Sequence, residues 1–272
     1  MLKNYKDFNV RKIKIIEIIK LKILKSKIIK IFATMPFIPK KYYCTICGSS
    51  VAFFLPKGIK SELFQTKNII GAGYRKNVRC PICGAADKTR YLDYILKQKT
   101  DIYSNPKNVI LHFAPEEAIE TKIRKITEGG YVTGDIVYGI ADKVVDVTDI
   151  CYPNSVFDYV IINHVLEHVP NERKAMEEIR RVLKDDGKIV FSVPICEDED
   201  TYESTIELDE SERLKKYGQE DHVRLYGRDI KPRMEKYGYN IVEYKAEDIL
   251  SKEDISNMRV LAKDRIFIGE IT

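Results

Sequence analysis

Beyond residue 105, short apolar runs alternate with segments whose apolar positions recur every three or four residues. The runs predict strands buried on both faces, and the segments between them predict amphipathic helices. This alternation is typical of a parallel α/β sheet with helices on both faces. We therefore expect strands at 109–113, 131–135, 143–147, 157–163 and 187–194, helices at 115–127 and 171–183, and a closing helix near 228–237 with strands at 239–245 and 265–271.

The first 40 residues have a different texture, dominated by Ile, Leu and Lys. Residues 10–32 predict a helix, which Met35 and Pro36 would end. Because its lysines fall all round a helical wheel, the segment lacks the clean apolar face of a membrane-surface helix. We expect it to pack on the body or on another subunit, as in a homodimer. Attachment to a membrane surface and contact with RNA are the alternatives.

Charge is distributed unevenly along the chain. Residues 1–45 carry 12 Lys and Arg against 2 Asp and Glu, and the remaining residues carry 34 against 39. The mildly acidic body therefore argues against nucleic-acid binding by the whole protein. No apolar run of about 18 residues and no secretory signal pattern is present, so we expect a cytoplasmic protein, at most peripheral to a membrane, with reduced cysteines.

Two C-x-x-C-G knuckles lie in a turn-rich stretch, residues 41–86, ahead of a predicted helix at 87–99. Each knuckle aims two thiolates at one point, and two knuckles complete a tetrahedral four-sulfur site with no open position. Such a metal helps to fold a segment too small for its own core. A redox pair and a disulfide are weaker alternatives. The expected ligands of structural zinc are Cys44, Cys47, Cys80 and Cys83.

The two other cysteines do not share this spacing. We expect Cys151 and Cys196 to be buried small apolar residues rather than nucleophiles.

Residues 144–194 carry a longer pattern, VVDVTDICYPNSVFDYVIINHVLEHVPNERKAMEEIRRVLKDDGKIVFSVP. This run closely resembles class I S-adenosylmethionine-dependent methyltransferases of the type 11-like group. From about residue 44, the chain also resembles a branch of that family with two zinc knuckles, an LHFAPE-like turn and a later YGQ-DHVR-YG segment. The resemblance implies a Rossmann-like methyltransferase domain over residues 87–272, with a substrate-lid insertion at about 196–227.

The resemblance also implies a cofactor site at the carboxyl ends of the strands, where open α/β sheets bind ligands. Asp135 would accept hydrogen bonds from both ribose hydroxyls. Asp146 would accept from the adenine amino group, while the backbone N–H of Val147 would reach a ring nitrogen. Asn163 and His164 would lie at the rim nearest the sulfonium.

The turn after the first strand, VILHFAPEEA, departs from the family. Family members have an acidic residue and then G-x-G-x-G, because the methionine end of the cofactor lies against bare backbone. This chain has His112 at the acid position, and at the glycine positions it has Ala114, Glu116 and Ala118. Pro115 suits the first position of a helix, and Glu116 complements its positive end and could pair with the α-ammonium. We therefore expect the turn to remain part of a cofactor site.

Methyl transfer requires aligned reactants and, for a hydroxyl or a protonated amine, a general base. His222, in the insertion, is the expected base, and His164 is the second candidate. Glu167 and His168 of the VLEH motif are expected to pack at a helix start. The expected substrate contacts are Arg224, Tyr202 and Glu203.

These patterns predict a S-adenosylmethionine-dependent methyltransferase that acts on an O or N atom of a small-molecule or glycan-type acceptor. One alternative is an RNA methyltransferase whose zinc module binds RNA. Another is a non-catalytic, zinc-stapled scaffold, which only the glycine-free turn favours. The phosphate contacts of the RNA alternative would be Lys57, Lys60, Lys67, Arg75, Lys76 and Arg79.

Two acceptor chemistries are disfavoured by the residues after the strands. INHV replaces the N-P-P-aromatic tetrad of base-amino methyltransferases, and no Pro-Cys nucleophile of a cytosine C5 enzyme follows the fourth strand.

Overall fold

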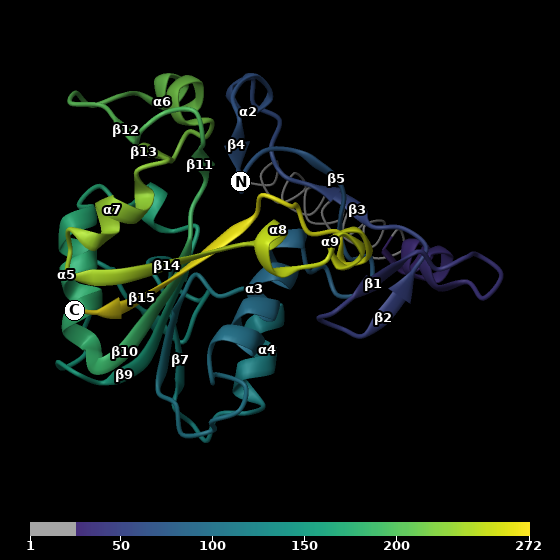
Figure 1. The fold of residues 1–272 in the computed structure, drawn as a ribbon, viewed down its shortest axis with the longest axis horizontal. Helices are drawn as coiled ribbons and strands as arrows, with labels where there is room; N and C mark the ends of the chain where they lie inside the picture. The colour runs from purple at the N-terminus through teal and green to yellow at the C-terminus, as the bar shows by residue number, and fades with distance from the viewer. Residues whose placement is uncertain (1–25) are drawn as a thin grey trace, which may run out of the picture.

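A seven-stranded sheet forms the centre of the computed structural model, which describes residues 26–272 (Figure 1). Five neighbouring strands run parallel, and β15 lies antiparallel between β10 and β14. The predicted α/β sheet is therefore confirmed. In spatial order the strands are β14 (Tyr239–Lys245), β15 (Arg265–Ile271), β10 (Leu183–Ser192), β9 (Phe157–Asn163), β6 (Ile110–Phe113), β7 (Tyr131–Asp135) and β8 (Lys143–Val144).

The sheet is buried on both faces, as the continuous apolar runs predict. Side chains alternate between the faces, so that Val160 and Ile162 of β9 enter one core while Tyr159 and Ile161 enter the other. The first core is covered by α5 (Glu172–Val182) and α7 (Ile230–Glu235). On the opposite face (Figure 1) lie α3 (Asp87–Lys99), α4 (Glu117–Arg124), α8 (Ala246–Ile249) and α9 (Lys252–Met258).

Several predicted elements have the predicted ends: α3, β7, β9, β14 and β15. Two predictions were wrong where the chain leaves the sheet. The strand expected at 143–147 pairs only over Lys143–Val144, because the Asp146 carboxylate closes a turn by accepting from the Thr148 N–H at 2.8 Å. The helix expected from residue 115 begins at Glu117, because Ala114 has a φ of 45° and turns the chain first.

A second sheet was not predicted. It joins the insertion after the fifth parallel strand to the N-terminal module, in the order β12 (Tyr202–Glu203), β13 (Arg224–Gly227), β11 (Ile195–Cys196) and β4 (Ile69–Ile70). The same insertion holds α6 (Glu210–Tyr217), which begins at a capping box formed by Asp209 and Glu212. The insertion is thus a folded layer above the strand ends (Figure 1).

The N-terminal module packs around the cysteines. Residues 26–34 are helical, so the predicted end of that segment before Met35 is confirmed, and residues 10–25 lie outside the described part. Ala33 is buried against Cys44 and Phe54. Among residues 26–272, no helix is long and apolar enough to cross a membrane. The module's short elements are β1 (Tyr42–Cys44), β2 (Ser49–Val51), β3 (Leu55–Lys57), α2 (Leu63–Thr66) and β5 (Arg75–Arg79).

One arginine joins this module to the α/β body. Arg90 of α3 is fully buried, and its guanidinium lies 4.3 Å from the centroid of the Phe54 ring. Its N–H groups donate to backbone carbonyls on both sides of the second knuckle and at the end of α9. The acceptors are Ala85 O at 2.9 Å, Val78 O at 2.8 Å, Met258 O at 2.6 Å and Arg259 O at 3.3 Å.

Replacing Arg90 should weaken the packing of α3 against the N-terminal module and against the end of α9. Arg90→Met leaves several buried carbonyls without donors, at a cost of about 1–3 kcal/mol for each unsatisfied group. We expect the free energy of unfolding of zinc-loaded protein to fall by at least about 3 kcal/mol in urea titrations, and Arg90→Lys to recover part of it. The matched control is Lys97→Met, an exposed cation on the same helix, which should change stability by less than about 0.5 kcal/mol. Equal effects of the two Met variants would contradict this role.

Candidate functional site

The chain reverses its direction of travel through the sheet at β6. From β6 it moves to β7 and β8 on one side, and then to β9 and β10 on the other, so the carboxyl ends of β6 and β9 are neighbours. Ligands of open α/β sheets bind at such a switch point. Both strands end in a non-glycine residue with positive φ, Ala114 at 45° and His164 at 53°. Left-handed backbone of this kind is strained and is concentrated at functional sites.

The glycine-free turn after β6 is held by a buried histidine. His112 is fully buried; its Nδ1 lies 2.8 Å from the Tyr131 hydroxyl and its Nε2 lies 3.1 Å from Oε2 of Glu116. Glu116 is the N-cap residue of α4, so its carboxylate stands at the positive end of that helix. His112, at the position where the resemblance implies an acid, therefore positions the carboxylate of Glu116, which belongs to the same turn. Pro115, expected at the first helical position, instead precedes the N-cap.

Two carboxylates lie beyond β7 and β8. Asp135 accepts from the Val137 N–H at 2.8 Å through one oxygen, Oδ1. Asp146 is exposed and also accepts from Thr148 through Oδ1 alone. Both carboxylates thus keep an oxygen for a ligand. The large apolar side chains exposed beside them are Ile136, Val137, Tyr138, Ile140 and Val144.

The end of β9 contains a buried donor without a partner. Asn163 is 6% exposed, and its Oδ1 accepts from the Ser192 hydroxyl at 2.9 Å. Its Nδ2 has no hydrogen-bond partner among the described residues. Because a buried unpaired donor costs free energy, this amide is suited to a ligand acceptor atom at the switch point. Val147, whose backbone is expected near the adenine, is itself buried.

A chain of three polar side chains follows Asn163. His164 Nδ1 lies 3.2 Å from Oε1 of Glu167, and His164 Nε2 lies 3.1 Å from Nζ of Lys88 on α3. Burial and the nearby lysine lower the pKa of His164. Burial and the neighbouring Arg75 lower the pKa of Lys88 to about 8. The sequence did not predict Lys88, because it reaches His164 from a helix far away in the chain.

In the insertion, the residues predicted as the general base and as a substrate contact, His222 and Arg224, are buried within the protein. His222 is fully buried, its Nε2 lies 2.8 Å from the side-chain nitrogen of Gln219, and burial lowers its pKa to about 4. Arg224 is also buried, and all five of its N–H groups face protein acceptors. Three of those N–H groups donate to backbone carbonyls of the loop after β9 and the other two donate to the Glu203 carboxylate, so Arg224 holds that loop in place. The acceptors of Arg224 are Leu166 O, Val169 O, Pro170 O and the carboxylate of Glu203.

Tyr202 is exposed and tilts against Tyr217 of α6. Glu167 and His168 form a short 3-10 turn, η1 (Leu166–His168), directly after β9, and Glu167 is buried.

The four knuckle cysteines converge on one point. The Sγ atoms of Cys44 and Cys83 are 3.7 Å apart, and those of Cys47 and Cys80 are 3.9 Å apart. A tetrahedron with metal–sulfur distances of about 2.3 Å has edges of about 3.8 Å, so this spacing suits a four-thiolate metal site. Hydrogen bonds from the Cys44 and Cys83 thiols lower the pKa of Cys80, to about 3.

The remaining cysteines differ from each other. Cys196 is buried against Leu208 and Tyr217, as predicted, whereas the prediction for Cys151 was wrong because it lies exposed in the loop before β9.

The basic residues proposed for RNA contact are partly used within the protein. Arg75 donates to both oxygens of buried Asp87, at 2.6 and 3.1 Å, and Lys67 pairs with Glu199 of the insertion. Lys60 lies over the Tyr74 ring. Within residues 26–272, the members of that set that are exposed and lack such an ion pair are Lys57, Lys60, Lys76 and Arg79.

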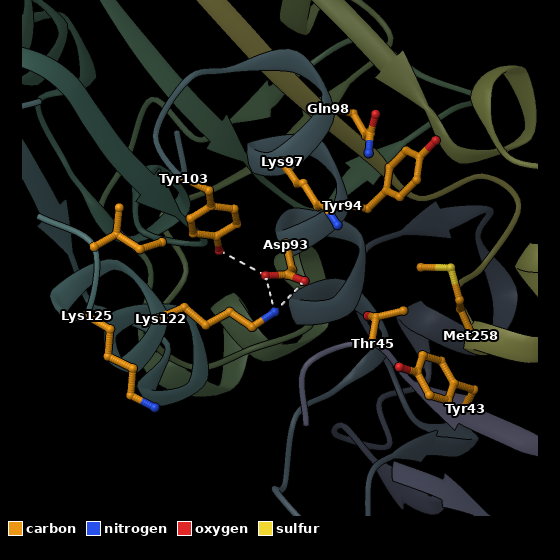
Figure 2. A pocket seen from close by; sticks show the side chains of 11 residues that line it. Tyr43, Thr45, Asp93, Tyr94, Lys97, Gln98, Tyr103, Lys122, Lys125 and Met258 are labelled. Atoms are coloured by element: carbon orange, nitrogen blue, oxygen red, sulfur yellow. Dashed lines mark hydrogen bonds and ion pairs between the residues drawn. The ribbon is translucent and has the colours of Figure 1, made fainter. Parts of the chain in front are cut away.

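A separate cavity of about 590 Å³ lies between the N-terminal module and helices α3 and α4 (Figure 2). Asp93 stands in it and accepts from Lys122 at 2.8 Å and from the Tyr103 hydroxyl at 2.9 Å. The charge of Asp93 is therefore paired within the protein. The lining of the cavity includes no residue from the carboxyl ends of the strands. We place the functional site at the switch point instead.

The family described as "Methyltransferase domain" matches residues 89–244, which is more than half of the 272 residues. The chain belongs to this methyltransferase family. No curated protein matches the sequence.

Solved structures similar to the chain include the YcgJ protein of Bacillus subtilis, with 12% identity, a TM-score of 0.43, and coverage of 66% of this chain and 98% of that one. They also include the phosphoethanolamine N-methyltransferase 2 of Haemonchus contortus, with 14% identity, a TM-score of 0.40, and coverage of 63% and 51%. At these identities the likeness concerns the fold alone.

Removing one thiolate should uncouple the metal from the module. In Cys80→Ser a poor zinc ligand replaces a buried thiolate, so we expect a chelator to strip the metal more readily and the melting temperature to fall by at least about 5 °C. Cobalt-substituted protein should also show weaker thiolate-to-cobalt charge-transfer absorption. Cys151→Ser, at an exposed position, is the matched control and should leave both properties unchanged. Wild-type protein without this absorption would exclude the four-thiolate site.

Proposed function

We propose that the chain is a S-adenosylmethionine-dependent methyltransferase that methylates an O or N atom of a small-molecule or glycan-type acceptor. The observation that carries the proposal is the set of polar groups at or just beyond the carboxyl ends of neighbouring parallel strands, beside the switch point. Asp135, Asp146 and Asn163 each present an oxygen or nitrogen there with no partner in the described chain. Their chemistry matches the hydroxyls and amines of a nucleoside with an amino-acid tail.

The residues present fit the cofactor group by group. The two carboxylates are suited to the ribose hydroxyls and the adenine amino group, and the exposed apolar side chains beside them are suited to the purine face. Glu116 offers a carboxylate to the α-ammonium, and the unpaired Nδ2 of Asn163 offers a donor to an acceptor atom of the tail. When bound, the cofactor supplies an electrophilic methyl group on a sulfonium.

The base that we propose is the His164 and Lys88 pair. His164 stands at the end of β9, and Glu167 fixes its ring by accepting from Nδ1. Because the pKa of Lys88 is about 8, its amine is available as a proton acceptor at mildly alkaline pH. This assignment replaces His222, whose burial removes it from an exposed lid.

The metal and the acceptor class follow from the same geometry. Zinc on the four thiolates closes the knuckles and leaves no open position, so its role is structural. We favour a small acceptor over RNA because Lys67 and Arg75 already pair within the protein and because the folded insertion covers the strand ends. The N-terminal segment remains a proposed contact for a second subunit or a membrane surface.

Cofactor binding is the primary test. We expect calorimetric titration of zinc-loaded protein to show micromolar binding of S-adenosylmethionine and S-adenosylhomocysteine. Asp146→Ala should weaken binding about 10- to 100-fold, since a hydrogen bond to a charged group contributes about 1.5–3 kcal/mol. Asp149→Ala removes a second exposed carboxylate three residues away and is the matched control. If neither compound binds to folded protein, the enzyme proposal fails and the scaffold alternative stands.

The pH dependence of methyl transfer tests the base. A lysine with a pKa of about 8 is protonated below that pH, so kcat/KM on an acceptor found by screening should fall as the pH drops through about 8. Lys88→Arg cannot lose its proton, and we expect it to remove this pH dependence and lower kcat/KM by about 100-fold. The charged and titratable groups that face Lys88 are Arg75, Asp87, His164, Glu167 and Asp264.

The control for this variant is Lys97→Arg, an exposed lysine on the same helix, which should keep the wild-type profile. A Lys88→Arg enzyme with wild-type kcat/KM at pH 8 would exclude Lys88 as the base.

A further inference from the structure

Three metal-ligating side chains meet behind the rim of the switch point. Glu167 and His168 come from η1 after β9, and His222 comes from the loop just before β13. One potential ligand atom from each side chain lies within 4.8 Å of the others. Glu167 is 1% exposed, His222 is fully buried and His168 is partly exposed, so the group is enclosed but can be reached from one side.

Each of the three side chains is held by a neighbour through one polar atom. The Glu167 Oε1 atom pairs with His164 Nδ1 at 3.2 Å. The His168 Nδ1 atom lies 3.3 Å from both the carbonyl and the carboxylate of Asp221. Since both of those groups accept hydrogen bonds, the proton of His168 is on Nδ1, and Nε2 carries the lone pair. Metal-binding histidines are oriented in this way by an outer carboxylate or carbonyl.

The third ligand is oriented by an amide. The Nε2 atom of His222 lies 2.8 Å from the side-chain amide of Gln219. The oxygen and nitrogen of an amide are interchanged by a half-turn, so the oxygen of Gln219 can take this place and accept from Nε2–H. The lone pair of His222 is then on Nδ1.

The second polar atoms of the buried pair are left unsatisfied. Within residues 26–272, neither Glu167 Oε2 nor His222 Nδ1 has a hydrogen-bond partner. Two buried acceptors without donors, on side chains already fixed by neighbours, are costly unless something positive lies between them. Neither atom is used by the proposed cofactor contacts.

We propose that Glu167, His168 and His222 bind a divalent first-row transition-metal cation, through one carboxylate oxygen and two imidazole nitrogens. This donor set is typical of catalytic metal sites, in which three protein ligands leave positions open for water or substrate. Ligand atoms about 2.1 Å from a cation lie about 3.0–3.4 Å apart, so side-chain rotations suffice to close the cluster from its present spacing.

The position of the site gives the cation a role that rests on the proposed methyl transfer. Glu167 contacts His164, so an acceptor hydroxyl bound to the cation would lie beside the proposed base. A cation held there would lower the pKa of that hydroxyl, whose proton would pass to the His164 and Lys88 pair. The oxygen–methyl bond then forms as the sulfur–methyl bond breaks, and the sulfur keeps the electron pair, giving S-adenosylhomocysteine. This role favours an oxygen acceptor over nitrogen.

The site can be tested without cofactor or acceptor. Protein whose four-thiolate site is already filled with zinc is titrated with Mn²⁺ and, separately, with Zn²⁺, by calorimetry and by loss of the free-Mn²⁺ paramagnetic resonance signal. We expect one further cation per chain. Glu167→Gln and His168→Asn should each weaken its binding at least about 10-fold, and His168, being partly exposed, can be replaced with little risk to folding. Glu220→Gln, an exposed glutamate in the same loop as His222, is the matched control and should bind as wild type.

Two results would overturn the proposal. The first is that neither cation binds to folded, zinc-loaded protein, in which case an ordered water bridges the three side chains. The second is binding that Glu167→Gln and His168→Asn leave unchanged, which identifies surface ions. Because S-adenosylmethionine binding is measured separately with Asp146→Ala, a metal site in a protein that does not bind the cofactor would refute the methyltransferase proposal alone. Cofactor binding without a metal site would refute this inference alone.

Discussion

The guanidinium of Arg90 is the constraint on which the arrangement of this protein depends. It is fully buried and donates to carbonyls of three segments: the strand before the second knuckle, the turn after that knuckle and, far along the chain, the end of α9. A buried cation is tolerated only where its donors are satisfied, so these segments must converge. That convergence fixes α3 against the module, and α3 in turn carries Lys88 to the switch point.

The sheet itself could be predicted from the sequence, because its signal is local. Continuous apolar runs and amphipathic segments define strands and helices residue by residue, and β7, β9 and α3 have the expected ends. The errors occur where a side chain or an unusual backbone conformation interrupts the pattern. Ala114 delays α4 by adopting a left-handed conformation, which hydrophobic periodicity does not encode. The short pairings of the second sheet carry too few residues for a period to show.

In the candidate site, too, positions set by the strand pattern could be predicted, whereas contacts made by tertiary packing could not. Asp135 ends β7 and Asp146 follows shortly after β8, so the place of both carboxylates beside the strand ends follows from the strand pattern. Their contact with the cofactor stays a prediction. The roles within the insertion do not follow from position. From its charge alone, Arg224 could bind a substrate. Its side chain is instead buried and donates to protein acceptors, which include the backbone carbonyls after β9. Lys88 carried no signal, since its partner His164 is brought to it only by tertiary packing.

Unsatisfied polar atoms give the strongest guide to what the site binds. Three of them, Asn163 Nδ2, Glu167 Oε2 and His222 Nδ1, lie on buried side chains at or beside the end of β9. The other two unsatisfied atoms among residues 26–272 are Thr45 Oγ1 and Arg265 Nε, whereas the buried guanidiniums of Arg90 and Arg224 donate to several protein acceptors. Packing that can supply five acceptors to one arginine could have supplied partners here as well. The concentration of unsatisfied groups at one strand end therefore indicates ligands, with a hydrogen-bond acceptor needed at one point and a positive charge at another. The tail of the proposed methyl donor and the proposed cation would meet both needs at the place where the sheet topology predicts a ligand.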